Sequence, residues 1–306
     1  YFSVIAILFG PILHWTTVLL APRPALQWFA LFITTHPKHL LAIGYWVLLL
    51  AFATRALQVT AKGMATANKI VNSSTTNATS TTAAAATAAS NSPDGSSTNH
   101  RVAEAPITLT TSQRLHLRKA FHLLVVAIVL PAQIVVPTFL RLALAIAFAA
   151  LVLIELLRNA AVPPFGQSVD GFLRIFRDDR DPGAVFVTHI YLLLACAVPV
   201  WLSNGFAAYA GVLSIGVGDA VASVCGLRYG QTKWPASSKS LEGSLCSLVA
   251  QVGCTVLLSA VGQGPTSVLA ALPALVAGVV LEAATLQVDN LVVPPIVFAM
   301  LVCAEG

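Results

Sequence analysis

Apolar runs about as long as a membrane-spanning helix follow one another along most of this chain. A helix needs roughly 20 mostly apolar residues to cross a bilayer. We identify about nine candidate runs, which centre on residues 2–21, 39–57, 120–136, 138–157, 185–202, 205–217, 244–262, 267–282 and 290–304. Several runs are short, above all the sixth, so the number of spans is nine to within about two. The sequence therefore predicts an all-α, polytopic bundle of transmembrane helices.

The overall composition agrees with this fold class. Of the 306 residues, 57% are hydrophobic and only 9% are charged. A soluble globular domain with this composition would have to expose large apolar patches. We therefore expect a lipid bilayer around the protein. Nucleic acid is not an expected partner, and the oligomeric state stays open.

The basic residues are distributed unequally between the two ends of the predicted spans. If each run crosses the bilayer once, fourteen Lys and Arg residues fall on one side, and only Arg23, Lys38 and Arg141 fall on the other. Loops rich in Lys and Arg stay in the cytoplasm. The richer side is therefore predicted to be cytoplasmic, and every polar cluster described below lies on it.

The composition divides the chain into three parts. Residues 1–59 carry N-terminal transmembrane helices, and residues 113–306 form the predicted catalytic membrane domain. Between them, residues 60–112 are low in complexity and rich in Ala, Ser, Thr and Asn, a composition typical of a disordered linker, here cytoplasmic. Because the chain begins at Tyr1 without an initiating Met, we interpret it as a fragment.

The most polar stretch in the catalytic domain runs from Gly211 to Ser244. Gly218 allows close backbone approach, and Asp219 follows it at the cytoplasmic end of a span. A carboxylate at the membrane edge indicates a functional site. Mg²⁺, which proteins bind through one or two carboxylates plus nucleotide phosphates, is the cation that suits it best.

The segment SSKSLEGS opens the next span and has the features of an anion site. Its serines and the backbone N–H groups near Gly243 lie at a predicted helix N-terminus, where anions are stabilised, and Lys239 adds positive charge. Glu242 could bind metal or accept a proton. The alternative is a polar loop between spans. The candidate phosphate-binding residues here are Gly218, Arg228, Lys233, Ser237, Ser238, Lys239, Ser240 and Gly243.

Two further clusters are predicted at the same membrane level. Arg118, Lys119 and His122 begin the third run, either as a cationic wall for an anionic substrate or as a basic anchor at the lipid headgroups. Glu282 ends the eighth run, and Asp289 begins the ninth. Carboxylates from distant parts of the chain could therefore meet around one metal.

Five segments together carry a resemblance to a known family. They are RKAFHLL at 118–124, THIYLLL at 188–194, GVLSIGVGDAVAS at 211–223, TKWPASSKSLEGS at 232–244 and EAATLQVDNLVVP at 282–294. In order and approximate spacing they resemble the dolichol kinases, over about residues 112–304. KSLEGS alone is also similar to phytol kinases and CTP-dependent diacylglycerol kinases. The chain departs from the family pattern at one position, because residue 238 is Ser where the family typically has the first Lys of a Lys-Lys pair. If that Lys is needed to bind CTP, Ser238 lowers the activity.

The resemblance implies transfer of the γ-phosphoryl group of CTP to dolichol, which yields dolichyl phosphate and CDP for protein glycosylation. It implies a multi-pass protein of the endoplasmic reticulum membrane with its active site in cytoplasmic loops. Joined to the motifs above, it assigns Lys239 and Lys233 to the phosphates. Mg²⁺ or another divalent cation goes to Asp219, Asp289 or Glu242, and either Asp219 or Glu242 is the base.

Other functions remain open from the sequence. A related phytol, prenol or diacylglycerol kinase would use the same chemistry on another lipid alcohol. A phospholipid cytidylyltransferase would also use CTP but would release pyrophosphate. A transporter would place its polar residues at mid-bilayer, whereas here they lie at the ends of spans.

Overall fold

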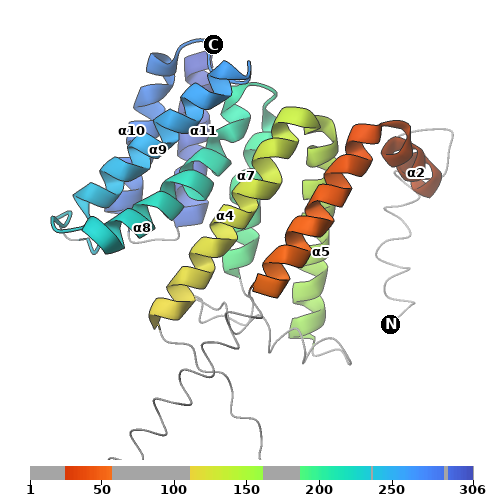
Figure 1. The fold of residues 1–306 in the computed structure, drawn as a ribbon, viewed down its shortest axis with the longest axis horizontal. Helices are drawn as coiled ribbons and strands as arrows, with labels where there is room; N and C mark the ends of the chain where they lie inside the picture. Colours follow the sequence, from red (N-terminus) through yellow and green to blue (C-terminus); the bar gives the residue numbers. More distant parts are fainter. Residues whose placement is uncertain (1–24, 57–110, 161–186, 236, 286–288, 306) are drawn as a thin grey trace, which may run out of the picture.

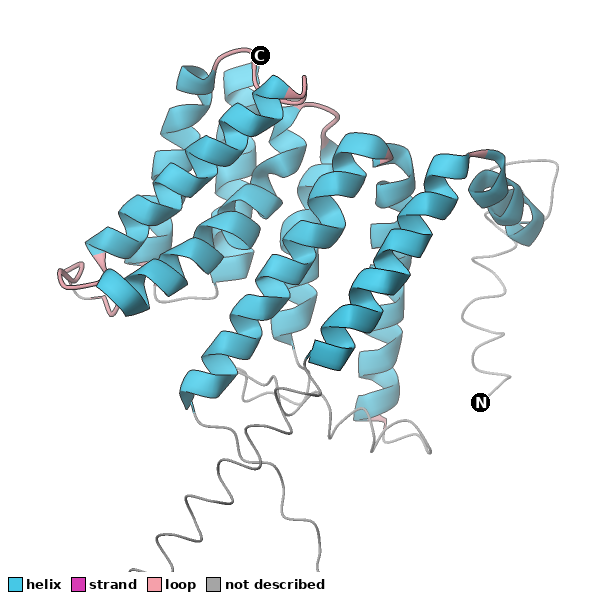
Figure 2. Ribbon diagram, viewed as in Figure 1, coloured by secondary structure: helices cyan, strands magenta, loops and turns pink. Residues whose placement is uncertain are grey.

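The computed structural model describes residues 25–56, 111–160, 187–235, 237–285 and 289–305 (Figure 1). Within these residues the regular elements are helices, apart from one isolated β-bridge between Lys233 and Ser240 (Figure 2). The predicted all-α fold class is confirmed. The first apolar run and the predicted linker lie outside the described residues.

The helices follow the apolar runs closely. Their bounds are α2 Ala25–Thr35, an unlabelled helix Pro37–Ala56, α4 Thr111–Val135, α5 Pro137–Asn159, α7 Val187–Leu202, η1 Phe206–Tyr209, η2 Val212–Asp219, α8 Ala220–Tyr229, α9 Leu241–Ala260, α10 Val268–Ala284 and α11 Asp289–Glu305. Among the described residues, four helical segments are long and apolar enough to cross a membrane: Pro37–Ala56, Pro137–Asn159, Phe206–Tyr229 and Leu241–Ala260. Four shorter apolar helices accompany them, which makes the protein a polytopic helical membrane protein.

The sixth apolar run differs from its predicted extent. It was expected to end near residue 217, but the helical segment continues to Tyr229 through 3-10, π and α geometry in turn. The reason is local, because AVASVCGL after Asp219 is apolar or small, and Gly230 follows only at the end of α8. Asp219 therefore lies inside a continuous helical segment and not at its end.

The α9 helix shows the inverted polarity expected of a helix in lipid. Its buried face carries Ser247, Gln251 and Thr255, spaced one turn apart, whereas Leu245 and Leu257 are 62% and 70% exposed. In a membrane, small and polar side chains pack between helices, and apolar side chains face the lipid. The buried polar face lies against η2, since Gln251 contacts the Gly218 backbone position.

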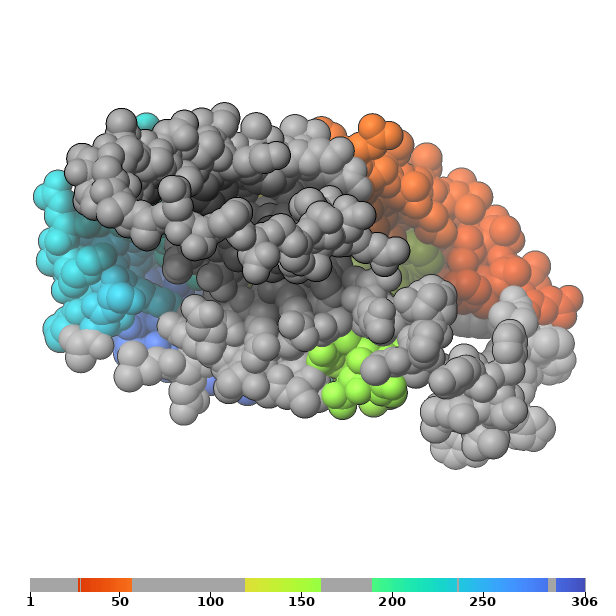
Figure 3. Space-filling view, turned by 90° about the horizontal axis from the view of Figure 1, so that it is seen from below, coloured from red at the N-terminus to blue at the C-terminus, as the bar shows by residue number. Residues whose placement is uncertain are grey.

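Two hydrophobic clusters hold the helices together. One joins η1, η2, α10 and α11 through residues such as Leu213, Leu275 and Val297. The other joins α4, α5 and α7, with the Pro37–Ala56 helix packed against it. Seen from below, that helix (orange) and the region around α8 (cyan) reach opposite edges of the molecule (Figure 3). The α4 helix lies between them and connects the two clusters.

Candidate active site

Asp219 is a buried carboxylate held by two residues of α4. The Lys119 ammonium donates to Asp219 Oδ2 at 2.5 Å and lies 3.5 Å from the Asp219 carbonyl oxygen. His122 Nε2 lies 3.4 Å from the same carboxylate oxygen. Lys119 and His122 share a face because they are three residues apart on a helix. Lys119 and His122, two of the three residues predicted as a cluster at the start of the third run, therefore point at Asp219.

A second ion pair lies beside the first. Lys239, just before α9, donates from Nζ to the Glu282 carbonyl oxygen at 2.8 Å and to Glu282 Oε1 at 3.2 Å. Glu282 is buried near the end of α10. Lys239 also interacts electrostatically with Asp219. We call Lys119, His122, Asp219, Lys239 and Glu282 the ion-pair cluster.

Burying the charges of the ion-pair cluster costs free energy, and the cluster lies where distant parts of the chain meet. Its members come from α4, η2, the loop before α9 and α10, so four separate parts of the chain meet there. Removing paired charges from water often costs more than their attraction returns. In a membrane protein, ionisable groups retained in such a place usually mark a functional site.

The loop between α8 and α9 is folded so that it presents Lys239 to the cluster. The Leu241 N–H donates to the Thr232 carbonyl oxygen at 2.9 Å, and the Trp234 N–H donates to the Lys239 carbonyl oxygen at 3.0 Å. Ser240 caps α9, since its hydroxyl accepts from the Gly243 N–H at 3.2 Å. The helix N-terminus predicted from SSKSLEGS is therefore present, with Lys239 directly before its cap.

Glu242 closes the base of this loop. Both of its carboxylate oxygens accept from the Thr232 N–H, at 2.9 and 3.2 Å. None of its described hydrogen bonds reaches the ion-pair cluster, so its predicted role as base or metal ligand stays a prediction. Lys233 is exposed and donates to the Ser238 carbonyl oxygen at 3.0 Å, while the Ser237 hydroxyl accepts from the Lys239 N–H at 3.2 Å.

The remaining predicted residues are distributed around the cluster. Arg228 ends α8, with its guanidinium 5.6 Å from the centre of the Tyr229 ring. Ser238 is exposed in the loop. Asp289 is the first residue of α11, but its side chain and that of Arg118 lie outside what the structure describes. Among the described residues there is no group of three or more His, Cys, Asp or Glu side chains that could hold a metal by itself.

Gly218 adjoins Asp219 at a tight helix contact. A Cβ at residue 218 would lie 2.6 Å from Gln251 Nε2 and 3.1 Å from the Ser247 hydroxyl. The close backbone approach predicted for this glycine is therefore made to α9 within the chain. It brings the π-helical turn that carries Asp219 against the polar face of α9, and π-helical turns occur frequently at functional sites.

Sequence reasoning missed two contacts of the site. It interpreted Lys119 as part of a cationic wall for an anionic substrate or of a basic anchor at the lipid headgroups, and it did not foresee that this residue pairs with Asp219. It grouped Glu282 with Asp289 among carboxylates that could meet around one metal, whereas the structure joins Glu282 to Lys239. The available signal was the rarity of charge, since a single Glu at the end of an apolar run needs a partner.

A prediction concerns the contact between α8 and α9. A Cβ at Gly243 would lie 2.7 Å from the Ala222 carbonyl oxygen, so we expect Gly243→Ala to destabilise the protein by about 1–3 kcal/mol through overpacking. Gly253→Ala is the matched control, because that position of α9 has nothing within 4 Å. It should leave stability unchanged or raise it by up to about 1 kcal/mol. Thermal unfolding in detergent measures both, and equal midpoints would show that the helices are not in close contact.

The fold and the site together define a class: a polytopic helical membrane protein in which two lysines pair with two buried carboxylates. Within that class the chain is similar to dolichol kinases. It is 38% identical over 205 residues to Dolichol kinase EVAN of Arabidopsis thaliana, which covers 62% of this chain and 35% of that protein. It is 36% identical over 193 residues to Dolichol kinase of Homo sapiens, a match that covers 58% of this chain and 36% of that protein. It is 31% identical over 159 residues to Dolichol kinase of Saccharomyces cerevisiae, a match that covers 51% of this chain and 29% of that protein.

The resemblance inferred from the five motifs is thus confirmed across plants, animals and yeast. The chain spans about a third of the length of these curated relatives. No family model and no solved structure matches the chain.

Proposed function

We propose that the protein carrying this chain is a CTP-dependent dolichol kinase. The observation that carries the proposal is the meeting of Lys119 and Lys239 with Asp219 and Glu282 at one end of the bundle, in a chain similar to proteins named dolichol kinase. The products are dolichyl phosphate, which supplies the lipid carrier for protein glycosylation, and CDP. The site faces the cytoplasm from the endoplasmic reticulum membrane.

Phosphoryl transfer depends mainly on neutralising and aligning phosphate oxygens. Lys239 lies directly before the N-terminus of α9, where its charge and the helix dipole act in the same direction. Lys119 reaches Asp219 from a different element, α4. We assign the CTP phosphates to the space between these ammonium groups, where the phosphate oxygens compete with Asp219 and Glu282 for them.

Asp219 is the proposed acceptor of the proton from the dolichol hydroxyl. In the reaction the hydroxyl oxygen forms a bond to the γ-phosphorus, and the bond from that phosphorus to the β–γ bridging oxygen breaks, so that CDP leaves with the electron pair. The alcohol proton passes to the Asp219 carboxylate. Lys119 and His122 hold this carboxylate in place, so it is oriented before the substrate arrives.

A divalent cation fits the donors present at the site. Asp219 supplies one carboxylate, and oxygen ligands from one or two carboxylates plus nucleotide phosphates are what Mg²⁺ prefers. We assign the ion to Asp219, with Asp289 as the predicted second ligand. When bound, the ion would neutralise developing charge on the phosphate oxygens.

The test of this proposal follows two labels of CTP into lipid. Membranes containing the protein are incubated with CTP labelled at the γ- or the α-phosphate and with dolichol, phytol or diacylglycerol. We expect γ-label in dolichyl phosphate and no α-label in any lipid. Membranes without the protein are the control, and γ-labelled ATP measures the preference for the donor.

Each other result changes the proposal in a defined way. If the γ-label appears only in phytyl phosphate or phosphatidic acid, the proposed phosphoryl transfer stands and the acceptor is phytol or diacylglycerol instead of dolichol. Label from the α-phosphate in lipid would identify a cytidylyltransferase and overturn the kinase assignment. Folded protein that labels no lipid would contradict the proposal, and Ser238→Lys would then test whether the departure in the loop is the cause.

A further inference from the structure

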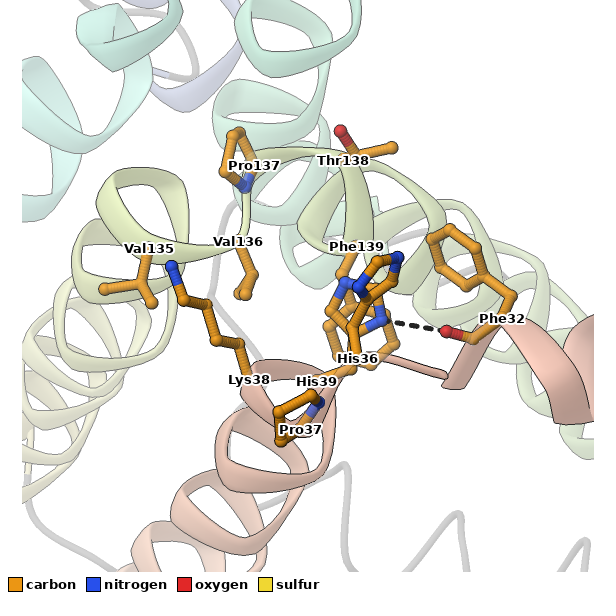
Figure 4. Close-up of a pocket in the computed structure, with 10 residues that line it drawn as sticks. All are labelled: Phe32, His36, Pro37, Lys38, His39, Val135, Val136, Pro137, Thr138 and Phe139. Carbon is orange, nitrogen blue, oxygen red and sulfur yellow. Dashed lines mark hydrogen bonds between the residues drawn. The ribbon is translucent and has the colours of Figure 1, made fainter. Parts of the chain in front are cut away.

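A pocket of about 390 Å³ lies at the opposite end of α4 from the ion-pair cluster (Figure 4). It is formed where the segment between α2 and the Pro37–Ala56 helix meets the turn between α4 and α5. Val135 lines it, sixteen residues beyond Lys119 on the same helix. At 1.5 Å per residue the two sites are about 24 Å apart, so the pocket is separate from the proposed active site.

The polar groups of the pocket are suited to an anion. His36, Lys38, His39 and Thr138 line it, and none of the described lining residues is acidic. Lys38 is exposed and forms no ion pair with any described residue. Figure 4 shows its side chain extending away from Pro37 and toward Val135 and Val136.

His39 is the buried polar group of the pocket, with only 7% of its surface exposed. Its Nδ1 lies 3.0 Å from the Phe32 carbonyl oxygen, and its ring stacks on Phe139 with centroids 4.7 Å apart and planes 16° apart. These contacts fix the ring. Its other nitrogen, Nε2, has no hydrogen-bond partner among the described residues, although the side chain lines the pocket. Because the Phe32 carbonyl oxygen only accepts, Nδ1 donates in this bond, and a bound group with a donor, such as the P–OH of a phosphate monoester, would give Nε2 its partner.

Two helices begin at the pocket and add to its positive potential. Pro37 begins one membrane-length helix and Pro137 begins α5, and both residues line the pocket. The first N–H groups of a helix lack partners within it, and the helix dipole is positive at this end. The Lys38 ammonium and the two helix starts therefore act together on one cavity.

The depth of the pocket in the membrane indicates what it would bind. Both helices that begin there are candidate spans, so their N-terminal ends lie at the level of the lipid headgroups. Leu41, one turn into the first of them, is 73% exposed, as expected for a side chain against acyl chains. Val136 and Phe139 provide apolar lining. The pocket thus offers cationic groups for a headgroup beside a surface suited to lipid tails.

We propose that this pocket binds the phosphate of an anionic phospholipid through Lys38, His39 and the first turn of α5. The test uses the full protein in neutral detergent and native mass spectrometry. The probes are short-chain phosphatidic acid, short-chain phosphatidylcholine and inorganic phosphate. We expect phosphatidic acid to bind, and Lys38→Ala to weaken its binding about tenfold, as expected for loss of one charge-assisted contact. Thr138→Val should weaken it by a smaller factor.

Arg55→Ala is the matched control, because Arg55 is an exposed cation at the other end of the same helix. It should leave binding unchanged. Equal weakening by Arg55→Ala and Lys38→Ala would show that general surface charge attracts the lipid and would overturn the proposal. Phosphatidylcholine binding as tightly as phosphatidic acid would also overturn it. Inorganic phosphate that displaces phosphatidic acid at equal concentration would assign the pocket to a free anion and not to a lipid.

Discussion

Replacement of Asp219 by Asn is expected to lower phosphoryl transfer by about 10³-fold. The substitution retains the shape of the side chain but removes the charge that we propose to accept the proton and bind the cation. Because Asp219 is buried and paired with Lys119, loss of its charge also leaves an ammonium without its counter-ion, which is destabilising. The measurement is initial-rate transfer of γ-label into dolichyl phosphate at saturating CTP.

A second variant separates the chemical role of Asp219 from its structural one. The double substitution Asp219→Asn with Lys119→Met removes both members of the pair, so no uncompensated charge remains. We expect this protein to recover the thermal stability that Asp219→Asn loses, yet to stay inactive. Full activity in Asp219→Asn would remove Asp219 from both proposed roles. Activity recovered together with stability would show that the pair is only structural.

Replacement of Lys239 by Ala is expected to have the next largest effect, a loss of about 10²–10³-fold in kcat/KM for CTP. Lys239 bonds to Glu282 and acts electrostatically on Asp219, and its ammonium lies in the space that we propose for the CTP phosphates. If it stabilises the transferring phosphoryl group, kcat should fall. If it only binds CTP, KM should rise and kcat should persist.

The conservative variant Lys239→Arg provides the matched comparison. It retains the positive charge and hydrogen-bond donors, and we expect it to recover a substantial part of the activity that Lys239→Ala loses. Thermal unfolding of both variants detects any loss of folding caused by the unpaired Glu282 carboxylate. If both variants are equally inactive at wild-type stability, positive charge at residue 239 is not sufficient for activity. The shape of the lysine side chain would then be required as well.

The sequence by itself determined the helical architecture and the capped start of α9. Long apolar runs permit only helices in a bilayer, because each backbone polar group must be satisfied within its own segment. The Ser240 cap of α9 was predictable for a similar reason, since a serine three residues before Gly243 satisfies the N–H groups of the first helical turn locally. Both signals are carried by neighbouring residues.

Only the tertiary structure decided which charges meet. Lys119 and Asp219 are 100 residues apart, and Lys239 and Glu282 are 43 apart. In helices that are apolar on nearly all sides, periodicity does not identify the packed face, so the sequence could not show that Lys119 faces η2 or that Glu282 faces the loop. It also placed the end of a span at Asp219, where packing instead supports a π-helical turn that continues into α8. Local sequence fixes where a helix forms, whereas the side chains that meet between helices depend on how those helices pack.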